Sequence, residues 1–160
     1  MSENNSSETL SQLYQEVIRE HHKDPRHYGT LSSPDAHAEG YNPLCGDKVI
    51  VELKLSKQAP SVLEDICFRG EGCSICMASA SMMAEEVQGK NLEEAEKAIA
   101  DFRGLMQGTL NPEVIEGDIR ALAGVRRFPV RIKCALLPWM TLKNAVEGRA
   151  GVPANTEKGE

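Results

Sequence analysis

Two alternating segments joined by a short connection constrain the fold of this chain most strongly. Residues 48–55 (KVIVELKL) place valine or leucine at every second position from Val49 onward, which is typical of a strand with one buried face. Residues 62–70 (VLEDICFRG) form a second strand-like segment after the turn SKQAPS. A parallel pair would need a crossover of about a dozen residues or more, so the two segments are predicted to form an antiparallel hairpin. One further short strand is expected around residues 37–41.

Helical periodicity is found on both sides of this hairpin. Apolar residues recur with helical spacing from Leu10 to Ile18, and Asp24-Pro25 is predicted to end that helix. Asn91 and Glu94 have the spacing of a capping box, which predicts another helix start. The later helices are expected over residues 73–89, 91–106 and 119–125 and from Pro129 onward, the last one kinked or restarted at Pro138.

The length favours a single domain. The chain has 160 residues and 17.5 kDa, close to the usual size of one domain. We expect this domain over residues 10–147, with flexible tails at residues 1–9 and 148–160. Only 4% of the residues are aromatic, so the core must consist mainly of Leu, Ile, Val, Ala and Met.

Charge and hydropathy exclude several classes of partner. The 18 basic residues against 24 acidic ones give a net charge of -6, which argues against binding a nucleic-acid backbone or an anionic membrane. No apolar run reaches the ~18 residues of a spanning helix, and the first residues lack the pattern of a signal peptide. We therefore expect a cytoplasmic protein.

The five cysteines are Cys45, Cys67, Cys73, Cys76 and Cys134. In a cytoplasmic protein they are better interpreted as core residues, metal ligands or nucleophiles than as disulfides. Cys45, Cys73 and Cys134 each stand where a loop meets a regular element, and Asp47 follows Cys45 closely. They are too far apart in sequence for a zinc-finger knuckle, so any shared site must be assembled by the fold.

Elementary chemistry supports such an assembly. A helix N-terminus favours thiolate over thiol, and three thiolates repel one another unless a cation neutralises them. Zn²⁺ with a carboxylate as fourth ligand would complete a tetrahedral shell.

Purely structural interpretations of these cysteines and of other candidate residues stay open. Free cysteines are commonly small buried residues, which is the expectation for Cys67. Cys73-x-x-Cys76 matches a redox motif, but the predicted sheet is antiparallel. His21, His22 and His27 follow a helix and are expected to be solvated partners of its dipole rather than ligands. Met82-Met83 is expected in the core, and Trp139 either in the core or at a partner contact.

Three motifs in order, NPLCGD (42–47), GEGCSICMASASMM (70–83) and RFPVRIKCALLPWMTL (127–142), resemble the SufU-type iron–sulfur assembly proteins, a branch of the IscU and NifU N-terminal scaffold family. The resemblance implies an α+β fold of the SufE/NifU-like kind, a small antiparallel three-stranded sheet with about five packed helices. It also implies a metal site at one end of the sheet, with ligands Cys45, Asp47, Cys73 and Cys134. Cys76 stands where the family often has serine, so no ligand role transfers to it.

The resemblance further implies a role in iron–sulfur cluster assembly. The expected protein is a zinc-bound sulfur acceptor that takes persulfide sulfur onto Cys45 from a PLP-dependent cysteine desulfurase of the SufS type and passes it to downstream scaffold components. The alternatives are a scaffold for a transient Fe–S cluster and a structural zinc adaptor. Two features favour the sulfur acceptor: extra residues between Cys73 and Cys134, placed in 105–123, and Lys133 in place of the scaffolds' histidine. We expect a monomer or a weak dimer.

Overall fold

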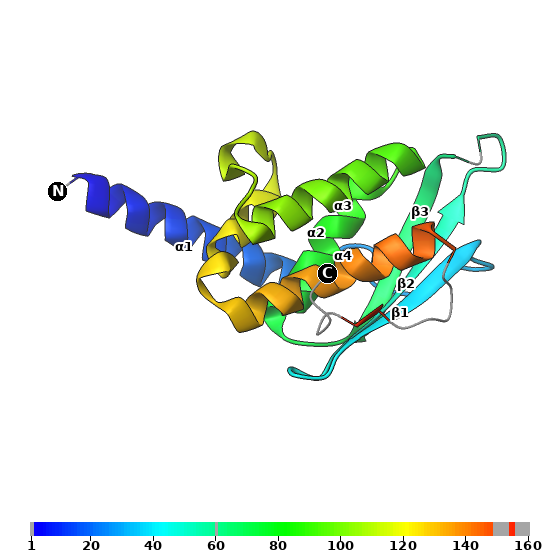
Figure 1. Cartoon of the computed structure of the whole chain (residues 1–160), viewed down its shortest axis with the longest axis horizontal. Coiled ribbons are helices and arrows are strands. Elements are labelled where there is room, and N and C mark those ends of the chain that lie inside the picture. The colour runs from blue at the N-terminus through cyan, green and yellow to red at the C-terminus, as the bar shows by residue number, and fades with distance from the viewer. Residues whose placement is uncertain (1, 60, 149–153, 156–160) are drawn as a thin grey trace.

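The computed structural model describes residues 2–59, 61–148 and 154–155. Its elements in chain order are α1 (Ser2–Lys23), β1 (Ala36–Asn42), β2 (Asp47–Leu55), β3 (Leu63–Glu71), α2 (Ser74–Val87), α3 (Leu92–Gln107), the 3₁₀ turn η1 (Pro112–Val114), the 3₁₀ helix η2 (Asp118–Arg127), α4 (Pro129–Val146) and β4 (Ala154–Asn155). The expected α+β fold is confirmed (Figure 1).

The sheet has the predicted antiparallel hairpin at its centre. The strand order is β3-β2-β1, with β4 added at the β1 edge. Both β1 and β3 pair with β2 in antiparallel register. Val49, Val51 and Leu53 are buried on the helix-covered face, as the alternation in β2 predicts.

The two-residue strand β4 was not predicted from the sequence. It lies within the segment 148–160, for which we expected a flexible tail, and pairs with β1 in parallel. The remaining residues of that tail, 149–153 and 156–160, lie outside the described part of the chain.

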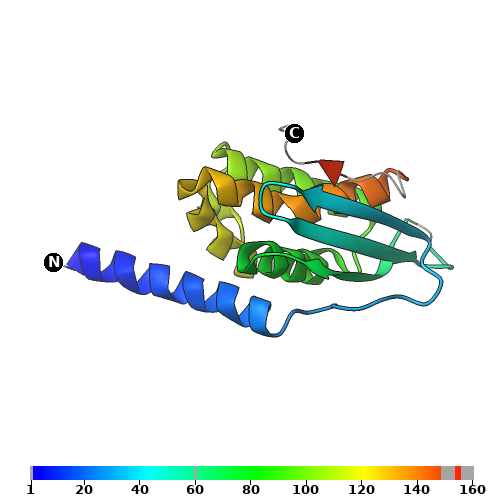
Figure 2. The same ribbon diagram turned by 90° about the horizontal axis from the view of Figure 1, so that it is seen from below.

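Helices cover one face of the sheet (Figures 1 and 2). Helix α4 packs on β1 and β2, and α2 packs on β3 and α4. Between α3 and α4, Phe102 and Trp139 stack with ring centroids 4.6 Å apart. The Trp139 indole N–H donates to Ser79 Oγ at 3.0 Å, so this tryptophan belongs to the core.

Three helix boundaries reflect local sequence chemistry. Helix α3 is opened by the predicted capping box of Asn91 and Glu94. Helix α1 ends at Lys23, before Asp24-Pro25 as predicted, but it begins at Ser2 rather than near Leu10. Residues 2–9 contain no Gly or Pro that would stop it.

Of the two outcomes expected at Pro138, a kinked helix or a restarted one, the restart does not occur in α4. It runs from Pro129 to Val146 as one helix with Pro138 inside it. Pro138 lacks the N–H that would bond the carbonyl of Cys134. Burial of α4 against the sheet and α2 offsets that loss, since Leu137, Trp139 and Leu142 are fully buried.

Within the described part of the chain, none of the helices combines the length and the apolar character that a membrane-spanning segment requires.

Candidate metal centre

One end of the sheet brings three distant segments together. The start of β2 is paired with the end of β3, with Lys48 opposite Glu71. This pairing places the loop before β2 beside the chain entering α2. Helix α4 lies across β1 and β2 and brings its first turns to the same end.

The loop before β2 is a tight turn that presents Cys45. The Cys45 and Gly46 amides donate to the Asn42 carbonyl at 3.3 Å and 2.8 Å, and Gly46 has φ 73°, a left-handed conformation that favours glycine. The Asn42 side-chain amide donates to Cys134 Sγ at 3.9 Å. The turn is thereby tied to α4, and Cys45 lies half-buried beside it.

Cys45, Asp47 and Cys134 form what we call the thiol cluster. One ligand atom from each lies within 4.8 Å of the others. The Cys134 thiol donates to Cys45 Sγ at 3.3 Å. Burial raises the pKa of the Cys134 thiol, and its hydrogen bond with Cys45 raises the pKa further. Without a cation, this thiol therefore stays protonated at neutral pH.

Asp47 provides the strongest indication that the thiol cluster binds a cation. The residue is fully buried, and its Oδ1 accepts a hydrogen bond from the Cys73 backbone N–H at 2.9 Å. Its Oδ2 is buried without a hydrogen-bond partner. A Cβ on Gly72 would lie 2.8 Å from Asp47 Oδ1, so the chain approaches the carboxylate more closely than other residues would allow. A buried carboxylate oxygen with no partner is costly, and a bound cation would satisfy it.

Cys73 lies next to the thiol cluster rather than inside it. It is the N-cap residue of α2, half-buried, and it makes no side-chain capping bond. The negative charge of an ionised Cys73 raises the pKa of Arg131, whose guanidinium lies close to Cys73 and Cys134. A guanidinium therefore lies beside two of the four residues that we expected at the site, as the position of Arg131 three residues before Cys134 suggests.

The other two cysteines are not members of the thiol cluster. Cys76 is fully buried in α2, and burial raises the pKa of its thiol. A buried, protonated thiol on an antiparallel scaffold does not fit the redox-motif interpretation of Cys73-x-x-Cys76. Cys67 is half-buried in β3, opposite Glu52 of β2, so it is less enclosed than the buried residue we expected.

His21 corrects the expectation of a solvated histidine. It is 1% exposed, and its Nδ1 and Nε2 lie 2.7 Å from Ser81 Oγ and 2.7 Å from Asp118 Oδ2. We call His21, Ser81 and Asp118 the histidine cluster. Glu85 lies nearby, 3.8 Å from Nε2, so His21, Glu85 and Asp118 form a second group of potential metal ligands. Because both ring nitrogens already have partners, the cluster is explained as a link from α1 to α2 and η2. Periodicity could not reveal this, since Asp118 comes from a distant segment.

An antiparallel sheet with cysteines and a buried carboxylate gathered at one end defines an α+β domain with a candidate metal centre. Residues 13–147 match the NifU-like N-terminal domain family, and the chain belongs to that family.

Two curated relatives and one solved structure show how similar the chain is to known members. It is 43% identical to the zinc-dependent sulfurtransferase SufU of Bacillus subtilis, over 89% of this chain and 95% of that protein. It is 42% identical to the iron–sulfur cluster assembly scaffold protein IscU of Streptococcus pyogenes, over 93% and 92%. The structure of a Fervidobacterium islandicum protein described as an iron–sulfur cluster assembly scaffold protein for the SUF system superposes with a TM-score of 0.75 at 32% identity, over 82% of this chain and 94% of that one.

Proposed function

We propose that this protein is a zinc-dependent sulfur acceptor in iron–sulfur cluster assembly. In this proposal Cys45, Asp47, Cys73 and Cys134 hold Zn²⁺, and Cys45 accepts sulfur from a PLP-dependent cysteine desulfurase in the cytoplasm and delivers it to downstream assembly components. The observation that carries the proposal is the buried, unpartnered Asp47 Oδ2 beside the Cys45 and Cys134 thiols. The SufU relative, which is named as a zinc-dependent sulfurtransferase, supports the same function.

The donor set fits zinc. Three sulfurs and one carboxylate oxygen match the number and type of ligands in tetrahedral zinc sites. Bound zinc keeps the thiols deprotonated at neutral pH, which burial alone opposes at Cys134. Asp47 is the only oxygen donor in the set, and we expect it to be the most readily exchanged ligand.

The transfer step is a thiol exchange that needs no outside oxidant. The Cys45 thiolate attacks the outer sulfur of the donor's persulfide, R–S–SH. A new S–S bond forms on Cys45, the S–S bond of the donor breaks, and the donor leaves as a thiolate. The transferred sulfur keeps its proton, so the product is Cys45–S–SH.

Exposure favours Cys45 over Cys134 as the acceptor. Cys45 is half-buried on a surface turn beside Leu44, which is 61% exposed, whereas Cys134 is fully buried. Arg131, which contacts Cys73 and Cys134, offers a positive charge to the anionic sulfur species at the site.

A cluster scaffold is the second candidate function, because three cysteines and an oxygen donor also suit a transient Fe–S cluster. The 42% identical IscU relative favours it. Lys133 weighs against it, since a lysine ammonium cannot ligate iron as a histidine would. A structural zinc adaptor, the third alternative, would require an inert Cys45.

Metal content and visible absorption of protein purified without oxygen separate these functions. About one zinc per chain with no sulfide-to-iron absorption would support the sulfur acceptor. Iron with matching sulfide and a brown colour would instead establish the scaffold. If Cys45 resists alkylation after zinc removal, only the adaptor is left.

A further inference from the structure

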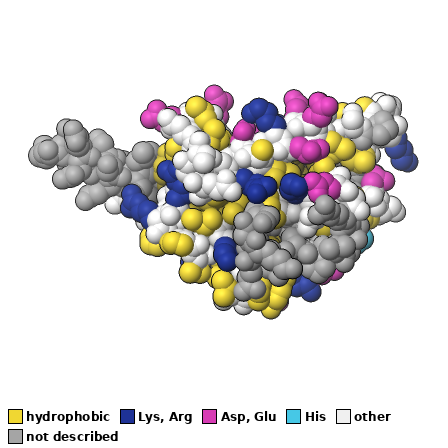
Figure 3. Space-filling view, viewed as in Figure 1, with side chains coloured by type: hydrophobic (Ala, Val, Ile, Leu, Met, Phe, Trp, Pro, Cys, Tyr) yellow, Lys and Arg dark blue, Asp and Glu magenta, His cyan; other side chains and the backbone are white. Residues whose placement is uncertain are grey.

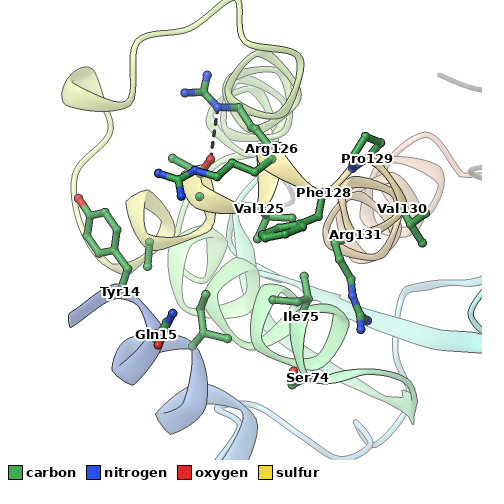
Figure 4. Close-up of a pocket in the computed structure, with 15 residues that line it drawn as sticks. Tyr14, Gln15, Ser74, Ile75, Val125, Arg126, Phe128, Pro129, Val130 and Arg131 are labelled. Carbon is green, nitrogen blue, oxygen red and sulfur yellow. Dashed lines mark hydrogen bonds between the residues drawn. The ribbon is translucent and has the colours of Figure 1, made fainter. Parts of the chain in front are cut away.

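A groove of about 1190 Å³ lies beside the thiol cluster, between α1, α2, η2 and the start of α4 (Figure 4). Small-molecule pockets usually have volumes of roughly 300–1,000 Å³, so this groove is larger than a small ligand needs. Its lining is mainly apolar, and Val125, Phe128 and Ile75 face one another across it (Figure 4).

The charges of the lining are opposite in sign to those of the whole chain. Three of the lining residues are arginines, Arg126, Arg127 and Arg131, and none is an Asp or Glu. The whole chain has a net charge of -6. In Figure 3, basic and hydrophobic side chains lie together over η2 and the start of α4, whereas acidic ones gather along the upper edge over α3. The three arginines therefore create a local positive potential in the groove of an otherwise acidic protein. This potential favours the binding of a partner segment with negative charges.

Large apolar side chains at the groove are unusually exposed. Phe128 is 59% exposed and Val130 57% exposed, directly between Arg127 and Arg131. An aromatic anchor flanked by arginines has the composition of a protein-binding surface, in which Phe and Arg are enriched.

The groove is continuous with the reactive residues. Ser74 and Ile75, which line it, directly follow Cys73, and Arg131 contacts both Cys73 and Cys134. A protein seated in the groove would therefore place its adjacent surface at the thiol cluster.

The walls of the groove are held in place before any partner binds. Asp118, at the start of η2, is bonded to the buried His21 of α1. The Arg126 Nε donates to the Ala123 carbonyl at 3.3 Å, which orients its guanidinium (Figure 4). A preformed surface loses less conformational entropy on binding than a mobile one does.

We infer that this groove is the docking surface for the sulfur-donor protein and that it receives a segment of that protein carrying carboxylates next to an apolar anchor. The inference rests on the proposed function, because it names the part of the chain by which the donor is recognised. The exposed Phe128 would contact the anchor, and Arg126 and Arg127 would pair with the carboxylates.

The test is the double charge reversal Arg126→Glu/Arg127→Glu, assayed for persulfide transfer from the desulfurase of the same cell. The KM for that transfer is expected to rise about tenfold or more. Added salt should raise the KM of the unmodified protein and have a much smaller effect on the variant, because the screened ion pairs are already lost. Zinc content and the melting temperature should stay unchanged.

The matched control is Lys54→Glu/Lys57→Glu, which reverses the same number of charges at the end of the β2–β3 hairpin opposite to the thiol cluster. From Asp47 to Leu55, β2 spans roughly 26 Å. This control should transfer sulfur normally. An unchanged KM in the arginine variant, or an equal rise in the control, would overturn the docking inference.

A second assay separates this inference from the proposed function. Glutathione persulfide needs no docking surface, so it should load Cys45 equally well in the unmodified protein and in the Arg126→Glu/Arg127→Glu variant. If it fails to load Cys45 even in the unmodified, metal-depleted protein, the sulfur-acceptor function itself is wrong.

Discussion

The thiol cluster and the histidine cluster each contain one fully buried polar side chain, Asp47 and His21, but the hydrogen bonding of these two side chains differs. In the histidine cluster, both ring nitrogens of His21 have partners at 2.7 Å. In the thiol cluster, Asp47 is equally buried, yet one of its carboxylate oxygens has no partner. The comparison teaches that a buried polar group with all its partners in the chain contributes to stability, whereas a buried carboxylate oxygen without one, placed beside two thiols, is a candidate ligand for a cation from outside.

The largest expected effect comes from removing the acceptor sulfur. Cys45→Ser should reduce sulfur acceptance below detection, because a serine hydroxyl is not ionised at neutral pH and cannot accept sulfur as a thiolate does. Mass spectrometry after incubation with the desulfurase and cysteine would measure the gain of one sulfur atom. Cys67→Ser is the control and should behave like the unmodified protein. Sulfur retained on the Cys45→Ser chain would contradict the assignment of Cys45.

Removal of the unpartnered carboxylate should weaken zinc binding more than it affects folding. Asp47→Ala is expected to lower zinc affinity by about 10–100-fold or more, measured by competition with a chelator. The metal-free protein should lose little stability, because the lost bond to the Cys73 N–H is offset by removing a desolvated carboxylate. Asp118→Ala, in the histidine cluster, should leave zinc affinity unchanged. If Asp47→Ala and Asp118→Ala release zinc equally readily, Asp47 is no more a zinc ligand than Asp118, and the contrast between the two clusters is wrong.

The histidine cluster should show the opposite behaviour. His21→Ala is expected to lower the free energy of unfolding by about 2–3 kcal/mol, because Ser81 and Asp118 lose a buried partner and a cavity is left. Zinc content should not change. His22→Ala is a matched control, since His22 is exposed in the same helical turn, and its effect should stay within about 0.5 kcal/mol. Denaturant titration measures both variants, and equal losses would refute the structural role of His21.

A smaller effect concerns the pH dependence of the metal-free protein. Burial raises the pKa of the Cys76 thiol above its ordinary value of 9.0. Above pH 9, this thiol therefore loses its proton in the unfolded chain but keeps it in the folded one, so the unfolded chain binds fewer protons. Stability should be at its full value below pH 9 and fall by up to about 1.4 kcal/mol per pH unit above it. Cys76→Ala should make this decline less steep. A slope that is the same in both proteins would show that other groups cause it.

Features encoded within a short stretch of sequence could be predicted, and features that depend on distant segments could not. The alternation of β2 and the Asn91 capping box correctly predicted the hairpin and the start of α3. The burial of His21 was missed because it depends on η2 packing against α1. Pro138 suggested a kinked or restarted helix, and the restart was wrong because a local rule cannot include the burial of α4.

The same contrast applies to the candidate site. Its four residues were expected from the positions of the cysteines and from the family resemblance. Their unequal geometry, with Cys73 at the margin and Arg131 beside it, is established only once the segments are assembled. The groove was not predicted, because its lining comes from four separate elements.

The register of the β2–β3 hairpin also determines the order in which the site can form during folding. Pairing of Lys48 with Glu71 closes a short loop and brings Cys45, Asp47 and Cys73 together by local contacts. Cys134 arrives only when α4 docks, which closes a much longer loop and is expected to be slower. On a growing chain, three of the four proposed ligands would therefore lie close together before the last thiol has emerged. Maturation of the centre would be completed by α4, whose first residues also form one wall of the groove.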